Sequence, residues 1–135
     1  MQDVMAALIA HLNTVTALTD LVSTRIFGGA IPESEIKNMP QKLLLLRYSG
    51  GPEVFRTHKV QRQRIDFFSY GEDYYEAGRV DRNLADALIA LSRNEVSNTM
   101  LHSAGYGGVV QLKEPDTGWE YVFRSALIIA GETAA

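Results

Sequence analysis

Residues 63–91, QRIDFFSYGEDYYEAGRVDRNLADALIAL, decide the fold class. The first part, up to Tyr70, is rich in aromatic and β-branched residues and predicts a strand that stops at Gly71. The second part predicts an amphipathic helix over residues 75–91, whose start is acidic, as the helix dipole favours. Its apolar positions recur three and four residues apart, at Ala77, Val80, Leu84, Ala87, Leu88 and Leu91.

The chain before this stretch predicts two short helices and one strand. Helical apolar spacing extends to about residues 11–13 and again over residues 16–22. Residues 23–40 contain two glycines and two prolines, so they predict a connecting segment with apolar anchors at Ile26, Phe27 and Ile31. The run of four leucines at 43–46 predicts a strand buried on both faces.

The chain after this stretch predicts two more strands. Residues 99–103 and 109–113 form one strand region, interrupted at residues 104–108 by a glycine-rich bulge or loop. Residues 114–118 have turn chemistry, and residues 119–130 form the last strand. The resulting order, α–β–β–α–β–β, predicts a single α+β domain over residues 1–135, with a flexible tail at about 131–135. Its sheet is expected to be antiparallel and mostly four-stranded, with the helices packed on one face.

The composition excludes several classes of site. The chain of 135 residues contains no cysteine, so disulfides, thiolate zinc sites, iron–sulfur clusters and cysteine nucleophiles are excluded. Its net charge of -3 does not favour attraction of the whole protein to nucleic acid or to an anionic membrane. The N-terminus lacks the basic segment of a signal peptide, and no apolar run is long enough for a membrane helix.

No arrangement of residues predicts catalysis, a metal site or a cofactor site. The three histidines lie far apart in the sequence, and none has a second ligand at a metal-binding spacing. The paired carboxylates fall in predicted loops or at a helix start, where capping and solubility explain them. The glycine-rich stretches match no phosphate-binding loop. We therefore expect a protein that is not an enzyme and that binds no cofactor. The histidines are His11, His58 and His102.

The segment from Lys42 to Arg64 is strongly basic. It holds six basic residues and one acid, whereas residues 71–135 hold five basic and ten acidic residues. Because residues 56–63 are polar on both strand faces apart from Val60, we expect a hairpin or loop around residues 50–63 to protrude. It is interpreted as a solvated hairpin, a nucleic-acid patch, or a contact with the acidic face of another copy. The candidate interface residues are Arg56, His58, Lys59, Arg62 and Arg64.

The order of these elements resembles a known family. The leading helix is followed by LTDLV at 18–22 and by Arg25-Ile26-Phe27, and Pro40 precedes the leucine strand. The strand at 63–70 then runs into the helix at 75–91, and the chain closes with a strand at 121–130. From about Ala6 to Gly131 the chain is similar to the tail terminator, or tail completion, proteins of long-tailed bacteriophages, which join head to tail.

The resemblance implies a structural role without catalysis. It implies a homo-hexameric ring that caps the tail tube, ends its polymerisation and presents the joining surface for the head. The implied partners are other copies, the major tail tube protein and the head connector or head-closure protein. Genomic DNA would pass through the ring without specific binding, and no membrane is involved. The implied location is the neck of the virion, at the top of the tail, after assembly in the bacterial host cytoplasm.

A second interpretation is a small ligand-binding module. A helix over one sheet face can enclose a pocket, and aromatic residues at strand spacing could line it. Aromatic residues at that spacing are also ordinary core or cross-strand partners. The candidate pocket residues are Phe67, Tyr70, Tyr106, Trp119 and Tyr121.

Overall fold

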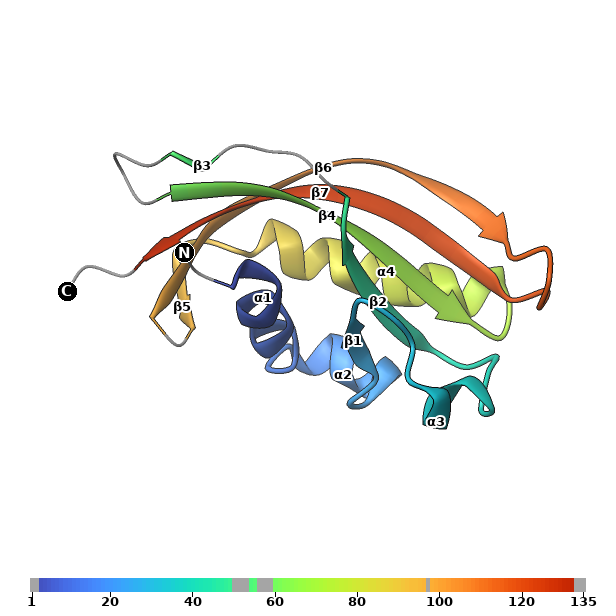
Figure 1. Cartoon of the computed structure of the whole chain (residues 1–135). Helices are drawn as coiled ribbons and strands as arrows, with labels where there is room; N and C mark the ends of the chain where they lie inside the picture. The colour runs from blue at the N-terminus through green and yellow to red at the C-terminus, as the bar shows by residue number, and fades with distance from the viewer. Residues whose placement is uncertain (1–2, 50–53, 56–59, 97, 133–135) are drawn as a thin grey trace.

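A curved sheet of seven strands arches over the helices in the computed structural model, which describes residues 3–49, 54–55, 60–96 and 98–132 (Figure 1). The fold is of the α+β class. Its elements are α1 (Val4–Leu12), α2 (Thr16–Val22), β1 (Ile26–Gly28), α3 (Glu33–Ile36), β2 (Leu43–Tyr48), β3 (Val54–Phe55), β4 (Val60–Gly71), α4 (Tyr74–Ile89), β5 (Asn94–Val96), β6 (Thr99–Lys113) and β7 (Glu120–Glu132).

The three long strands β4, β7 and β6 form the centre of the sheet. The strand order is β1-β2-β4-β7-β6-β5, and β3 pairs with β4 outside this path. All pairs are antiparallel except β1 with β2, which are parallel. The predicted four-stranded sheet is therefore wrong in strand number and in order, although its central strands were located.

The strands that the sequence did not predict are short. β1 and β5 have three residues each and β3 has two, so none is long enough to show an alternating pattern. β1 lies in the predicted connecting segment, where the anchors Ile26 and Phe27 pair with Leu44 and Leu45 of β2. Residues 104–108 belong to β6, and the register shift between Tyr106 and Val109 confirms the bulge interpretation over the loop.

The hairpin predicted around residues 50–63 is present in the described residues, where Val54 and Phe55 of β3 pair with Gln61 and Val60 of β4. Its β4 strand, however, does not protrude from the sheet. Val60 to Gln63 pair with residues 128–131 of β7, and Gln61 is buried. The neighbouring residues 50–53 and 56–59 lie outside the described residues. β7 continues to Glu132, and the rest of the tail predicted at about 131–135 lies outside the described residues.

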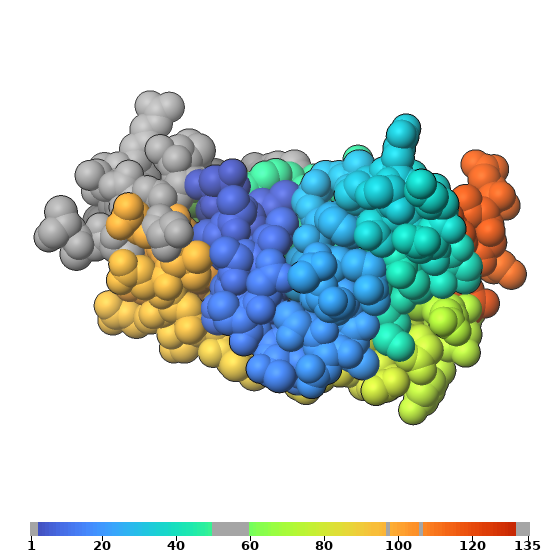
Figure 2. Space-filling view, turned by 90° about the horizontal axis from the view of Figure 1, so that it is seen from below, coloured from blue at the N-terminus to red at the C-terminus, as the bar shows by residue number. Residues whose placement is uncertain are grey.

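The helices α1, α2 and α4 agree well with their predicted ranges and enclose the main core, whereas the short α3 lies in the segment that was predicted to be a connection. α1, α2 and α4 lie beneath the concave face of the sheet, and Figure 2 shows α1 and α2 from that side. Asp3 and Asp73 cap α1 and α4 by accepting hydrogen bonds from the amides of Ala6 and Glu76. The largest fully buried core side chains are Leu8, Leu12, Leu18, Leu44, Leu46, Ile65, Phe67, Leu84, Leu88, Leu101 and Ile128.

The junction between β4 and α4 requires a glycine. A Cβ atom at Gly71 would lie 2.4 Å from the backbone nitrogen of Ala77 and 2.8 Å from the carbonyl carbon of Glu76. Backbone atoms cannot move aside as a flexible side chain can. The glycine therefore lets α4 start directly against the end of its strand.

One ion pair crosses the core between α4 and β7. The guanidinium of Arg124 donates from Nε and Nη2 to the two carboxylate oxygens of Asp81, both at 2.9 Å, and both side chains are almost fully buried. Nη1 also donates to the carbonyl oxygen of Gly107 at 3.3 Å. The sequence pattern assigned Asp81 to the outside of the helix, but it lies on the buried side with Ala77 and Leu84.

We predict that breaking this pair is far more costly than replacing it. Asp81→Leu or Arg124→Met alone leaves one buried charge without its partner and should lower the free energy of unfolding by about 3–5 kcal/mol. The double variant should lose less free energy of unfolding than the two single variants lose together. Chemical denaturation of the four proteins measures this coupling, with exposed Asp86→Leu on the same helix as control. Additive effects would show that the pair does not act as a unit.

Candidate assembly surface

The convex face of the sheet, called here the outer face, is turned away from α1, α2 and α4 (Figure 1). It carries a band of apolar side chains that is buried at Leu43, Leu45 and Tyr70 and exposed at Val110 and Leu112. Ring centroids of Phe68 and Phe123 lie 5.4 Å apart, and those of Tyr70 and Tyr121 lie 5.3 Å apart. Near β1 and β2 this face is covered by Ile31. The strand register forms two cross-strand rows, Leu45–Phe68–Phe123–Val110 and Leu43–Tyr70–Tyr121–Leu112.

The band ends at a long free edge of the sheet. β5 pairs only with residues 99–101 of β6, so no described strand pairs with the outer edge of β6 beyond Leu101. Residues 103–112, SAGYGGVVQL, contain no charged residue and no proline. Val110 and Leu112 are 50% and 40% exposed. An uncharged edge strand with exposed apolar side chains is a typical pairing site for another chain.

The structure describes two of the five predicted interface residues. Arg62 and Arg64 lie on β4 and, as alternation predicts, on the same face, opposite Ile129 and Leu127 of β7. Arg56, His58 and Lys59 lie outside the described residues. These two arginines therefore form a basic patch on the outer face, whereas Lys42 of the same segment pairs with Glu76 of α4.

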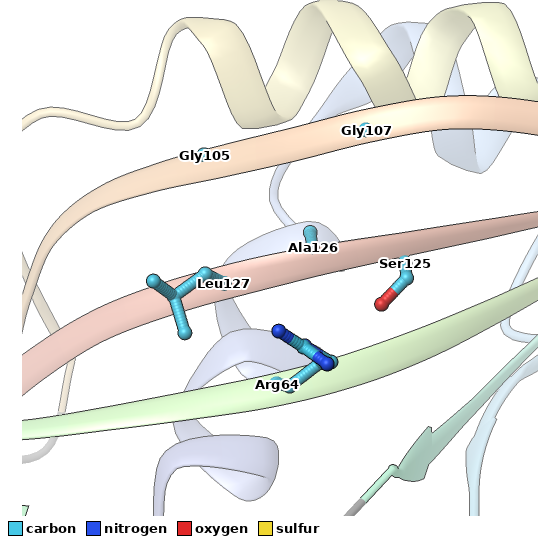
Figure 3. Close-up of a pocket in the computed structure, with 6 residues that line it drawn as sticks. All are labelled: Arg64, Gly105, Gly107, Ser125, Ala126 and Leu127. Carbon is cyan, nitrogen blue, oxygen red and sulfur yellow. The ribbon is translucent and has the colours of Figure 1, made fainter. Parts of the chain in front are cut away.

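A shallow hollow lies beside this patch, across β4, β7 and β6 (Figure 3). Its volume is about 490 Å³. The side chains of Arg64, Ser125 and Leu127 border it in Figure 3, and β6 contributes Gly105 and Gly107, which have no side chains. The hollow thus combines one exposed cation, one hydroxyl and an apolar wall.

The other end of the long strands is acidic. Gly71 pairs with Glu120, so the β4–α4 junction, with Glu72 and Asp73, lies beside the start of β7. The β6–β7 turn, residues 114–119, adds Glu114 and Asp116 and extends past the body of the molecule in Figure 2. The described part of the sheet therefore has a basic patch on β4 and an excess of acidic residues at the end where β4 meets α4.

The β6–β7 turn is held rigidly by Glu114. The amide of Glu114 donates to the carbonyl of Trp119, and the Gly118 amide donates to the carbonyl of Glu114. Its carboxylate accepts hydrogen bonds from Thr117 Oγ1 at 2.8 Å and Tyr70 Oη at 3.2 Å. Burial, followed by the Glu114 charge, raises the pKa of Tyr70, so its hydroxyl remains a donor. The turn predicted at 114–118 is confirmed.

The described residues form no metal cluster. No group of three or more His, Asp or Glu side chains among them is placed to hold a metal ion. His11 lies on α1, where burial lowers its pKa, and His102 lies on β6, while His58 is outside the described residues. No single described helix is long and apolar enough to cross a membrane; α1 and α2 pass that test together, by length and composition alone, but are bent by 88°.

The aromatic residues predicted to line one pocket do not share a face. Phe67 is fully buried in the core beneath the sheet, whereas Tyr70 and Tyr121 belong to the outer face with Trp119. Nothing is described for the Tyr106 side chain. A second hollow of about 330 Å³ lies between the N-terminal helices and α4, bordered by His11, Val15, Ala17, Asn83, Asp86, Ala87, Ala90 and Asn94.

We predict that the apolar residues at the edge of β6 contribute little to folding. Replacing both Val110 and Leu112 by Thr should change the free energy of unfolding by no more than about 0.5 kcal/mol per site, because both are exposed. Ile128→Ala, on the inner face of the sheet, should lower the free energy of unfolding by about 2–5 kcal/mol. Urea denaturation compares the two proteins, and similar losses would show that the band belongs to the core.

Comparison with known proteins supports the fold. No family model matches the sequence, and no curated protein matches it. Among solved structures, a chain from "Virion of native gene transfer agent (GTA) particle" is similar, with a TM-score of 0.62 and 16% sequence identity. The alignment covers 98% of this chain and 98% of that chain. At this identity the likeness shows that the two chains share a fold over nearly their whole length.

Proposed function

We propose that this protein is a structural component of a phage-like virion. The observation that carries the proposal is the likeness to a chain of a gene transfer agent particle, which leaves almost no part of either chain unmatched. A match of this extent covers a whole domain and its outline, not one shared motif. The outer face supplies what such a component needs, which is a surface suited to contact with other protein chains.

Within the virion, we propose the role of tail terminator. The sequence resemblance to tail completion proteins supports this role, as does the separation of opposite charges along the sheet. A head-to-tail contact between such ends produces a ring if the rotation closes. The proposed ring is a homo-hexamer that caps the tail tube, with the tube protein on one side and the head connector on the other. In this role the protein performs no catalysis.

The proposed ring surrounds the path of the DNA without binding it specifically. Arginine side chains crowded along the bore would retain DNA by releasing its counterions. We therefore expect the basic patch with Arg64 to face another protein and the bore to be neutral or acidic. The proposed location is the neck of the particle, reached after assembly in the bacterial host cytoplasm.

Deletion of the gene tests the role directly. We expect induced lysates of the deletion strain to contain overlong or unattached tails beside separate DNA-filled heads, as seen by electron microscopy. The wild-type gene on a plasmid should restore joined particles. Normal particles from the deletion strain would rule out the terminator role. Tails of normal length that remain unjoined would support a virion role but contradict termination of the tube.

A further inference from the structure

The hollow on the outer face has an exposed cation without a partner among the described residues. Arg64 is exposed beside the hollow, and no described carboxylate forms an ion pair with it. Ser125 Oγ and the Leu127 side chain border the same space (Figure 3). The chemistry of this hollow fits an acidic group carried next to an apolar one.

The fold would tolerate a side chain at Gly105, on the β6 side of the hollow. A Cβ atom at Gly105 would meet no heavy atom within 4 Å, and this glycine has no positive φ angle. Glycine inside a strand weakens it, and it often marks a place where another chain approaches closely. Packing of the core therefore does not explain the glycine at position 105, whereas close approach of another chain to β6 would.

The acidic end of the sheet presents a group that matches this hollow. Pro115 and Asp116 are exposed at the tip of the β6–β7 turn, and the Glu114 hydrogen bonds hold the turn in one conformation. A turn held in this way loses little conformational entropy on binding. Its tip places a carboxylate beside a proline ring.

We propose that the hollow receives the tip of the β6–β7 turn of a second copy, with Asp116 against Arg64 and Pro115 against Leu127. The inference rests on the proposed function, because this contact would join neighbouring subunits of the ring. A single copy cannot make it, since Arg64 pairs with Leu127, which lies seven residues along β7 from Glu120, or roughly 23 Å of strand at 3.3 Å per residue, and the turn lies beyond Glu120. The two surfaces differ, so the contact is heterologous and repeats from copy to copy.

Charge reversal tests the pairing of the two ends. Arg64→Glu and Asp116→Arg should each weaken self-association of the purified full chain about tenfold or more, because like charges then face each other. Mixing the two variants should restore assembly, since each acidic surface then meets a basic one. Sedimentation velocity over a concentration series measures this. Lys37→Glu and Asp20→Arg, exposed sites away from the sheet, are the matched controls. Equal association of all these proteins would overturn the proposal.

Cross-linking tests the same contact in assembled particles. The chain has no cysteine, so the double variant Ser125→Cys/Asp116→Cys carries the only two thiols. Oxidation should produce a ladder of dimers, trimers and larger species, because each copy contributes one thiol to each of two neighbours. Ser125→Cys/Lys37→Cys should remain monomeric. A product that stops at dimers, or no product at all, in particles and in concentrated free chain would overturn the proposal.

The variant Gly105→Val distinguishes an effect on assembly from an effect on the stability of the fold. The added side chain enters open space in a strand, so the melting temperature should stay the same or rise, while assembly should be lost. Unchanged assembly would contradict the proposal. The gene deletion tests the proposed virion role separately from the proposed contact between copies. Normal particles in the deletion strain would reject the virion role, whereas the ladder of cross-linked species from the free chain would still decide whether the contact forms. Joined particles from the Arg64→Glu strain would reject the contact and leave the virion role standing.

Discussion

The buried ion pair between Asp81 and Arg124 fixes how the sheet and its main helix fit together. Two hydrogen bonds of 2.9 Å set the distance and rotation of α4 relative to β7, which apolar packing alone would leave adjustable. The third bond, to the Gly107 carbonyl, ties the same arginine to the bulge of β6. One side chain thus links the core to the edge strand, whose outer side borders the hollow.

The two faces of the sheet follow from the same alternation along β4 and β7. Inward positions of β7 are Val122, Arg124 and Ala126, and these pack on or bond to α4, while the positions between them point outward. On the outer face the apolar rows are buried near β2, where Ile31 and Met39 pack against them, and exposed at the β6 edge. A chain of this size can bury one such layer under its helices, so the second face is left for contacts with other molecules.

The sequence predicted the parts of this fold that repeat a period. The helix at 16–22 was located in full and α4 within two residues of each end, because their apolar positions recur over several turns. The predicted number of strands was wrong, since β1 and β5 have three residues each and are too short to show an alternation of apolar and polar residues. The burial of Asp81 was not predicted, although its spacing from Ala77 and Leu84 places it on the apolar stripe of the helix. Two features of the sequence could have indicated it: a charged residue on that stripe, and an arginine among the alternating apolar residues of a later strand.

The candidate surface was only partly predictable, because it depends on which strands become neighbours. Sequence patterning placed Arg62 and Arg64 on one strand face, but only the sheet order brings Leu127 and Gly105 beside them. The same order brings the acidic residues of three separate segments together at the opposite end. Part of the charge separation seen along the sequence thus becomes a separation between the arginines of β4 and the acidic end of the same sheet. Opposite charges on different surfaces of one chain favour contacts that repeat in a single direction, which suits a ring more than a symmetric dimer.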